Sequence, residues 1–240
     1  MWLGTRDGLV RFDGYSFRLF RNTPNGVNRA GNEITCMLEV QKGSVLTGRE
    51  YYGLWLFDSQ TETFTSFFHD DNNEKSLCNN SILEIFRDSK GNIWIGTRNG
   101  FDLFDFKNKS FTHFKPFHES DSNNTVSGFA EDKNGLLWMV CPLSNMLVSF
   151  DLKEEKFNYF PYVNNSIKTI NWGGSKIICD SKDNIWIGSE YDGLLKFDTK
   201  THGTTNITPL LKTNSTDVVT FLRTVENKEE IIWVGTDGGG

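Results

Sequence analysis

Cysteine and histidine are scarce in this sequence, and their spacing argues against the common zinc sites. Four cysteines and four histidines are spread over 240 residues, and no two cysteines form a Cys-x-x-Cys pair. Zinc fingers and zinc ribbons depend on such closely spaced ligands. We therefore expect no metal site and no cofactor, and we expect the cysteines to behave as small buried residues.

Long apolar runs and clusters of basic residues are missing as well. Apolar runs are only a few residues long, and Met1 leads directly into a strand-like segment, so neither a membrane span nor a signal peptide is predicted. The chain has 25 Lys and Arg against 31 Asp and Glu, a net charge of −6. Nucleic-acid binding needs clustered cationic side chains, so we do not expect nucleic acid as a partner.

Motifs of common hydrolases, nucleotide-binding proteins and zinc peptidases do not occur in the sequence. His118 beside Glu119 offers an acid/base pair, but the polar stretch around them is more typical of a solvated loop. The Asp-x-x-Gly turns lack the alternating oxygen ligands of a calcium loop. We therefore predict no catalytic residues, and we expect the turn aspartates to accept hydrogen bonds from turn amides.

Aromatic residues, in contrast, are abundant. The chain has 20 Phe, 7 Trp and 6 Tyr but only 5 Pro, which favours strands packed face to face over a helical bundle. A Phe-Asp dipeptide recurs at intervals of 45 to 47 residues. Its copies are Phe12-Asp13, Phe57-Asp58, Phe104-Asp105, Phe150-Asp151 and Phe197-Asp198. A repeat of this length is typical of a β-propeller, in which each blade is one repeat.

Each repeat predicts four short strands. A Trp-x-Gly strand precedes the Phe-Asp pair, as in Trp94-Ile95-Gly96, and a Phe-x-x-Phe strand follows it, as in Phe111 to Phe114. Another strand comes before the Trp strand and is joined to it by a turn rich in Asp, Gly and Asn. Propeller blades are covered on both faces by their neighbours, so aromatics at both i and i+3 can be buried.

We therefore predict an all-β fold, a β-propeller of four-stranded antiparallel blades with about five blades present. The chain is expected to be a single propeller region, 1–240, and a fragment of a larger, seven-bladed propeller. The predicted repeat units are 1–20 (partial), 33–67, 81–114, 126–160, 170–207 and 217–240 (partial). Leu46 and the segment Val140-Cys141-Pro142 depart from the pattern, and we expect their blades to be locally distorted.

One segment carries a recognisable family pattern. It reads Ser76-Leu77-Cys78-Asn79-Asn80-Ser81-Ile82 and then Asp88-Ser89-Lys90-Gly91-Asn92-Ile93-Trp94-Ile95-Gly96-Thr97-Arg98-Asn99-Gly100, with Phe104-Asp105 and Phe111-Thr112-His113-Phe114 after it. This pattern resembles the two-component regulator propeller repeat. The resemblance implies the periplasmic sensor region of a membrane-anchored hybrid two-component histidine kinase, a class in which many members detect glycan breakdown products and control genes for polysaccharide use.

The same resemblance implies partners for the chain. These are an oligosaccharide ligand, the remaining propeller blades, the immunoglobulin-like and kinase domains of the full protein, and a second copy in a homodimer. Any kinase activity belongs to the downstream domains, so the region itself is expected not to be an enzyme.

Blade topology predicts which face carries a site. With strands A to D running alternately up and down, the B–C turns and D–A connections share one face, where irregular segments, including His118 and Ser144, lie. Candidate ligand-binding side chains there can bind sugar hydroxyls or carboxylates, or cover the apolar face of a sugar ring. They are Arg6, Asp7, Arg49, Glu50, Tyr51, Tyr52, Arg98, Asn99, Asn145, Trp172, Glu190, Tyr191 and Asp192.

The repeat leaves three functions open. The one we favour is a non-enzymatic sensor propeller that binds a carbohydrate or relays its binding to a kinase. A propeller enzyme such as a polysaccharide lyase is the alternative, and it would be indicated by His118 converging with acids in a deep pocket. A propeller that serves only as a protein interaction platform is also compatible with every repeat residue.

Overall fold

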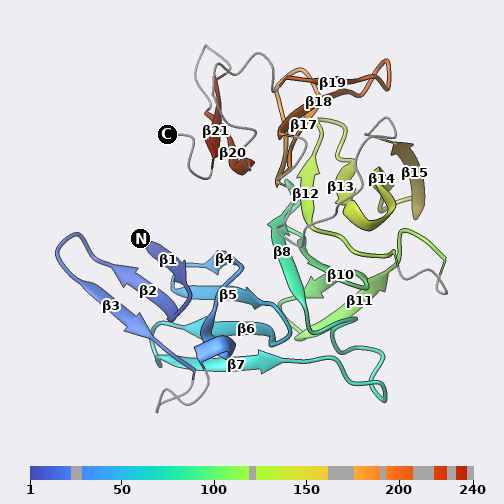
Figure 1. Ribbon diagram of the computed structural model, residues 1–240. Helices are drawn as coiled ribbons and strands as arrows, with labels where there is room; N and C mark the ends of the chain where they lie inside the picture. The colour runs from blue at the N-terminus through green and yellow to red at the C-terminus, as the bar shows by residue number, and fades with distance from the viewer. Residues whose placement is uncertain are drawn as a thin grey trace. The chain divides into compact units, whose positions relative to one another are not determined.

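The computed structural model describes residues 1–22, 29–118, 123–161, 176–189, 193–207, 219–225 and 231–236 (Figure 1). Regular structure in these residues consists of β-strands and two short 3-10 turns, so the predicted all-β fold is confirmed. No helix in the described part of the chain is long and apolar enough to cross a membrane. The chain divides into two compact units, 1–115 and 116–240, which are described separately.

The first unit contains three antiparallel sheets, each with its strands in chain order (Figure 1). The first has three strands, β1 (Trp2–Thr5), β2 (Gly8–Phe12) and β3 (Phe17–Phe20). The second follows a 3-10 turn at Arg29–Asn32 and has four, β4 (Cys36–Gln41), β5 (Ser44–Arg49), β6 (Gly53–Asp58) and β7 (Thr63–Phe67). The third also has four, β8 (Ile82–Arg87), β9 (Ile93–Thr97), β10 (Gly100–Asp105) and β11 (Ser110–Phe114).

The second unit repeats this plan. Its first sheet comprises β12 (Gly128–Glu131), β13 (Leu137–Cys141), β14 (Met146–Asp151) and β15 (Lys156–Pro161), with a 3-10 turn at Pro142–Ser144. Its second comprises β16 (Lys176–Cys179), β17 (Asn184–Ser189), β18 (Gly193–Asp198) and β19 (Thr204–Asn206). The last pair is β20 (Val219–Val225) and β21 (Ile231–Thr236). Four of the six described sheets therefore have the four antiparallel strands predicted for a propeller blade.

Burial along the strands shows that the sheets are covered on both faces. Every residue of β5, β9 and β13, the second strands of their blades, is buried. The fourth strands β7, β11 and β15 are largely exposed or half-buried. A second strand without a wet face is expected when blades stack against one another, because each blade then has a neighbour on either side.

The hydrophobic cores lie between consecutive blades. In the first unit, Leu46 and Leu54 of one blade pack in the same cluster as Ile82, Ile95 and Phe104 of the next. A second cluster of that unit joins the first sheet to the second. In the second unit, one cluster contains residues of both four-stranded sheets. Within each unit, consecutive blades thus bury apolar side chains against one another, as in a β-propeller.

Aspartates close the turns between the first and second strands. The Asp88 carboxylate accepts the backbone N–H groups of Lys90 and Asn92 at 3.0 and 2.8 Å, together with the indole N–H of Trp94 at 3.0 Å. Asp132 and Asp180 make the same three kinds of bond in their blades. The predicted role of these aspartates in satisfying turn amides is confirmed.

The aspartate of each Phe-Asp pair closes the next hairpin in the same way. Five backbone N–H groups, each two residues after its aspartate, donate to those carboxylates at 2.7–2.9 Å. The acceptors are Asp13, Asp58, Asp105, Asp151 and Asp198. Both recurring aspartates of the repeat therefore belong to the scaffold.

The two departures from the repeat cause only local irregularity. In the blade of Leu46, β5 pairs along its whole length with β6, and the register shifts only between Glu39 and Gln41 on β4. In the blade of Cys141, a 3-10 turn at Pro142–Ser144 extends the hairpin. The predicted distortion is thus confined to one bulge and one turn, and both blades keep four strands.

Candidate functional site

The predicted ligand-binding residues that the structure describes lie on hairpins joining the second and third strands of their blades. They are Arg6 and Asp7 between β1 and β2, Arg49 at the end of β5, Glu50 to Tyr52 between β5 and β6, Arg98 and Asn99 between β9 and β10, and Asn145 between β13 and β14. The others, Trp172, Glu190, Tyr191 and Asp192, lie outside the described residues.

Three of the predicted residues meet across two neighbouring blades of the first unit. The Arg98 guanidinium forms an ion pair with the Glu50 carboxylate and lies 4.8 Å from the centre of the Tyr51 ring. The Arg98 side chain is only 17% exposed, whereas Tyr51 is 61% exposed. We call Glu50, Tyr51 and Arg98 the hairpin cluster. It presents an aromatic ring, a cation and a carboxylate on one surface.

The hairpin that carries Glu50 and Tyr51 is longer than its counterpart in the next blade. Three residues separate the paired Arg49 and Gly53, whereas two separate Thr97 and Gly100. Tyr51 takes up the extra length with a φ of +67°, a left-handed conformation that is unfavourable for a bulky side chain. The blade therefore holds this exposed ring in a strained backbone position.

Arg49 lies beneath this hairpin and is buried, with 1% of its surface exposed. Its guanidinium lies 4.7 Å from the centre of the Trp55 ring, and Nη1 donates to the Gly31 carbonyl. Nε and Nη2 are buried and have no hydrogen-bond partner among the described residues. Burial lowers the pKa of Arg49 to about 10, because desolvation disfavours its charged form.

The repeat has a smaller residue where Arg49 lies. Thr5 and Thr97 occupy the equivalent paired positions, and the hydroxyl of each donates to the carbonyl of the glycine opposite it, at 2.8 and 2.9 Å. Arg49 replaces this scaffold hydroxyl by a buried cation. Burying an uncompensated charge is costly, so the substitution is a departure from the repeat that stability does not explain.

Arg6 forms a separate, weak ion pair. Its Nε lies 3.6 Å from a carboxylate oxygen of Glu33, and the two side chains are 92% and 54% exposed. An exposed pair of this kind contributes little free energy, because water screens it. Among the described residues, the ion-pair partner of Arg6 is Glu33, which does not belong to the hairpin cluster.

Three other predicted residues take part in their own turns. The backbone N–H groups of Asp7 and Asn99 donate to the hydroxyls of Thr5 and Thr97 at 3.2 and 3.1 Å. Asn145 ends a 3-10 turn in the left-handed conformation, with a φ of 54°. The backbone conformation of these three residues therefore serves their own turns.

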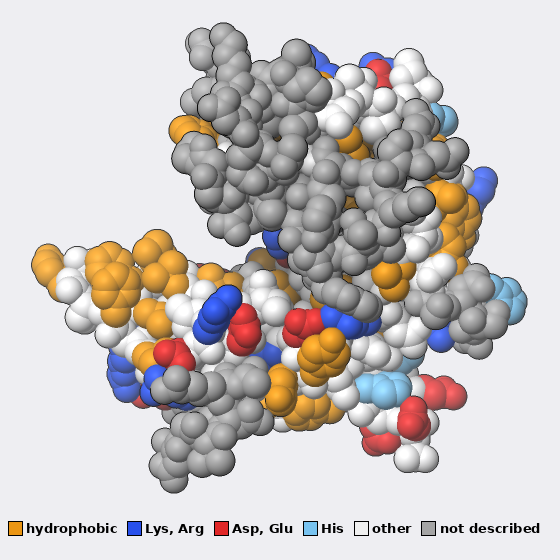
Figure 2. All heavy atoms as spheres, viewed as in Figure 1, with side chains coloured by type: hydrophobic (Ala, Val, Ile, Leu, Met, Phe, Trp, Pro, Cys, Tyr) orange, Lys and Arg blue, Asp and Glu red, His pale blue; other side chains and the backbone are white. Residues whose placement is uncertain are grey.

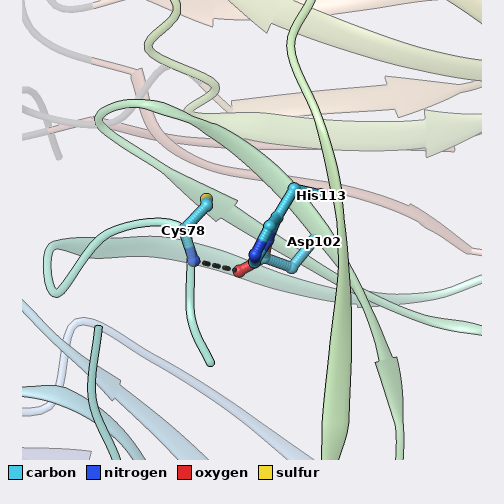
Figure 3. Close-up of side chains that lie close together, drawn as sticks. All are labelled: Cys78, Asp102 and His113. Carbon is cyan, nitrogen blue, oxygen red and sulfur yellow. Dashed lines mark hydrogen bonds and ion pairs between the residues drawn. The ribbon is translucent and has the colours of Figure 1, made fainter. Parts of the chain in front are cut away.

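A second polar cluster lies in the third blade of the first unit, where no site was predicted (Figure 3). The buried Asp102 carboxylate accepts a hydrogen bond from Nδ1 of His113 at 2.7 Å and another from the Cys78 backbone N–H at 3.0 Å. The Cys78 thiol lies 3.2 Å from the hydroxyl of Thr97. One donor atom of each of Cys78, Asp102 and His113 lies within 4.8 Å of the other two.

Electrostatics in this cluster follow from burial and from Asp102. The hydrogen bond to Asp102 raises the pKa of His113, since the carboxylate favours the imidazolium form. Burial, with a further contribution from the Asp102 charge, raises the pKa of Cys78 well above its usual value. In the absence of an ion the thiol is therefore protonated and the imidazole is held against the carboxylate.

Sequence reasoning missed this cluster because its members come from three separate segments. The signal was present in the alignment of the repeats with one another. Asp102 is the third residue of β10, and the third residue of the equivalent strand is apolar in the other four blades. Those residues are Val10, Trp55, Val148 and Leu195.

The comparison with protein families agrees with this architecture. Residues 76–99, which include Cys78 and the turn aspartate Asp88, match the family described as "Two component regulator propeller". Over these residues the chain is similar to a two-component regulator propeller repeat. The matched segment lies in the connection to the third blade and its first two strands, where the sequence carries the same resemblance.

Known proteins resemble larger parts of this chain. Histidine kinase P4 of Formosa agariphila is 30% identical over 61% of the chain, which spans 14% of that protein. The extracellular domain of a putative hybrid two-component system from B. thetaiotaomicron has a TM-score of 0.74 at 21% identity, covering 98% of this chain and 30% of that one. The chain is thus a small part of the length of these relatives.

The propeller fold is also shared with an enzyme. A catalytically inactive virginiamycin B lyase from Staphylococcus aureus, solved with quinupristin, has a TM-score of 0.65 at 13% identity, covering 96% of this chain and 71% of that one. Structural matches at such low identity establish the β-propeller fold and leave the activity to be argued from the residues of the site.

Proposed function

We propose that this chain is part of the extracytoplasmic, periplasmic sensor region of a hybrid two-component regulator. In this proposal it binds a soluble carbohydrate, without chemical conversion, and thereby regulates glycan use. The observation that carries the proposal is the hairpin cluster, in which polar and aromatic side chains from the hairpins of two neighbouring blades meet on one surface.

The chemistry of the hairpin cluster suits a sugar. An exposed tyrosine ring can cover the apolar face of a pyranose, and the ring of Tyr51 is largely accessible. Arg98 and Glu50 supply a donor and an acceptor beside it, and both can form charge-assisted hydrogen bonds to hydroxyl groups. Their mutual ion pair fixes the orientation of both groups before a ligand arrives.

Backbone strain supports a binding role for the same hairpin. A left-handed conformation at a bulky residue costs roughly 1–3 kcal/mol, and such outliers concentrate at ligand-binding sites. Among the described residues, seven that are not glycine have a positive φ, and Tyr51 is the bulkiest of them. The retention of tyrosine at this position is explained if its ring has a function that glycine cannot provide.

The residues do not favour the lyase alternative. His118, the residue with the best chance of acting as a base, is exposed, and the neighbouring Glu119 lies outside the described residues. The hairpin cluster in the first unit contains no histidine. Binding without catalysis therefore accounts for the described side chains more simply.

An exposed apolar face suggests where a further blade packs. Hydrophobic side chains gather over the β2–β3 hairpin (Figure 2). They are Tyr15, Phe17 and Leu19, which are 98%, 68% and 38% exposed, and Met1 at the start of β1 is 69% exposed. Because the described blades of this unit cover one another with apolar side chains, we propose that another propeller blade covers this face. Transmission through immunoglobulin-like and kinase domains, or through a homodimer, belongs to the same proposal.

The sensing proposal is tested by a binding screen on the complete sensor region. Neutral and acidic oligosaccharides are titrated by calorimetry, and the best binder is then measured with Tyr51→Ala and Arg98→Ala. We expect each substitution to weaken binding at least tenfold. Arg18→Ala, which removes a half-exposed arginine paired with Glu62 outside the hairpin cluster, serves as the control and should bind normally. Binding that survives both cluster substitutions, or heat release with none of the oligosaccharides, would contradict the proposal.

A further inference from the structure

We infer that Cys78, Asp102 and His113 form a binding site for a thiophilic divalent cation such as Zn²⁺ or Co²⁺. The three side chains offer a sulfur, a carboxylate oxygen and an imidazole nitrogen, the three donor types found in protein zinc sites. Their donor atoms already lie within 4.8 Å of one another. Tetrahedral zinc with bonds of about 2.0–2.3 Å separates its ligand atoms by roughly 3.3–3.6 Å. Side-chain rotations that move the donor atoms by about 1 Å therefore suffice to enclose an ion.

The three donors are placed by elements that restrict their movement. Asp102 on β10 and His113 on β11 are paired directly opposite each other in neighbouring strands. Cys78 belongs to the connection that precedes β8, and its own backbone N–H is hydrogen-bonded to Asp102. Figure 3 shows the three residues close together, with the Cys78 backbone N–H directed at Asp102. The ligand set is therefore assembled before an ion binds, which limits the entropy cost of binding.

The groups around the donors resemble the outer shell of a metal site. The imidazole of His113, besides its bond to Asp102, hydrogen-bonds to the backbone of Glu74. Metal-binding histidines usually have such a bond at the ring nitrogen that does not coordinate, because it fixes the ring orientation. The Thr97 hydroxyl lies 3.2 Å from the Cys78 sulfur while it donates to the Gly100 carbonyl, so its oxygen can accept a hydrogen bond from the Cys78 thiol.

The repeat shows that these residues are not required by the scaffold. The position of Asp102 is apolar in the other blades, as described above. Its cross-strand partner, which is His113 in this blade, is Leu19, Ser66 or Tyr159 in three others. Burying the Asp102 carboxylate completely costs free energy of folding. Its presence at a position that is apolar in the other blades therefore calls for a role other than folding.

Ion binding at this site balances in charge and protons. When His113 is in its imidazolium form, the incoming dication replaces the proton on the Cys78 sulfur and the Nδ1 proton that His113 donates to Asp102, so two protons are released to solvent. When the ring is neutral, its proton moves to Nε2 and only the thiol proton is released. No electron is transferred, and a water molecule completes the fourth position of a tetrahedral ion. The His113 side chain is 32% exposed, so an ion can reach the otherwise buried donors from that side.

The donor set also predicts selectivity. Sulfur and imidazole nitrogen favour zinc and cobalt, whereas calcium and magnesium prefer oxygen ligands alone. We therefore expect calcium and magnesium not to compete with zinc for this site.

The test is a titration of the reduced, purified chain with Co²⁺, followed by competition with Zn²⁺. A thiolate bound to cobalt gives a charge-transfer absorption band in the near ultraviolet, which reports coordination by a cysteine directly. We expect this band in the wild type and its loss in Cys78→Ser. Cys36→Ser is the matched control, because Cys36 lies in the same unit and is 8% exposed compared with 9% for Cys78. The control should keep the band.

A second variant covers the case in which Cys78→Ser does not fold, as judged by circular dichroism. His113→Asn keeps the thiol and removes the nitrogen ligand, and we expect it to weaken cobalt binding at least tenfold. The inference is overturned if the wild type shows no band, if the band persists in folded Cys78→Ser, or if His113→Asn binds cobalt as the wild type does. In each of those outcomes the cluster is only a hydrogen-bonded clamp between the connection and the blade.

Discussion

The indole nitrogen of Trp94 donates a hydrogen bond of 3.0 Å to the carboxylate of Asp88, six residues earlier in the chain. The same carboxylate closes the turn between β8 and β9 by accepting two backbone N–H groups. One side chain thus joins the turn to the buried strand that follows it. Because Trp94 is 1% exposed, its N–H group has no access to water if this acceptor is lost.

We predict that Asp88→Ala destabilises the protein by about 2–3 kcal/mol, because it leaves a buried indole N–H and two turn amides without their acceptor. Urea unfolding followed by tryptophan fluorescence measures this change. In a double-mutant cycle with Trp94→Phe, the two effects should not add, since the second substitution removes the donor of the same bond. A loss below about 0.5 kcal/mol, or full additivity in the cycle, would show that the bond has little importance.

Acid should weaken the hairpins closed by the Phe-Asp aspartates. Hydrogen bonds from the backbone of Ser16 and Tyr15 lower the pKa of Asp13 to about 2, and the backbone and side chain of Asn108 lower the pKa of Asp105. Because these folded-state pKa values lie below those of the unfolded chain, the stabilisation is present above about pH 4 and is lost as the pH falls toward 2.

This pH dependence is measured as the urea concentration at which half of the protein is unfolded. The measurement runs from about pH 5 to about pH 2, the range in which carboxylates titrate. Asp105→Asn removes one titrating group, so the midpoint of this variant should fall less steeply with acid than that of the wild type. Thr112→Ser, at an exposed residue of β11 without a titratable group, should leave the slope unchanged. Equal slopes for Asp105→Asn and the wild type would contradict the assignment.

Replacing Arg49 by methionine should stabilise the isolated chain by about 1–2 kcal/mol, since it removes a buried cation while keeping apolar contact with Trp55. Arg49→Lys, which retains the charge, is the control and should give no gain. Thermal unfolding of both variants decides the matter. If methionine lowers the stability instead, the guanidinium has stabilising partners that outweigh its desolvation.

Glycine at position 51 should relieve strain and remove the ring together. We predict that Tyr51→Gly raises the stability by about 1 kcal/mol, because glycine adopts a φ of +67° without steric cost. The same variant should lose oligosaccharide binding in the complete sensor region. Tyr52→Gly, at a neighbouring residue that lacks positive φ, should instead be destabilising. Loss of stability in Tyr51→Gly would show that the ring, and not the backbone, dominates at this position.

The scaffold was predictable because its signals are local and repeated. Asp88 and Trp94 are six residues apart, and their spacing recurs at Asp132 and Trp138, so one turn geometry explains every copy. The candidate binding residues were predictable only by their place on a hairpin. Whether Arg98 reaches Glu50 depends on how two blades pack, and the separation of these residues in the sequence does not predict the distance between their side chains.

The amino-acid sequence by itself determined the blades: their number of strands, their turns and the family to which the repeat belongs, because each depends on residues within about ten positions of one another. Tertiary structure alone decided three things. It buried Arg49 beneath its own hairpin, joined Arg98 to the neighbouring blade, and brought Cys78, Asp102 and His113 within 4.8 Å. These arrangements depend on contacts between segments that are distant in sequence, and such contacts are set by the packing of the whole unit.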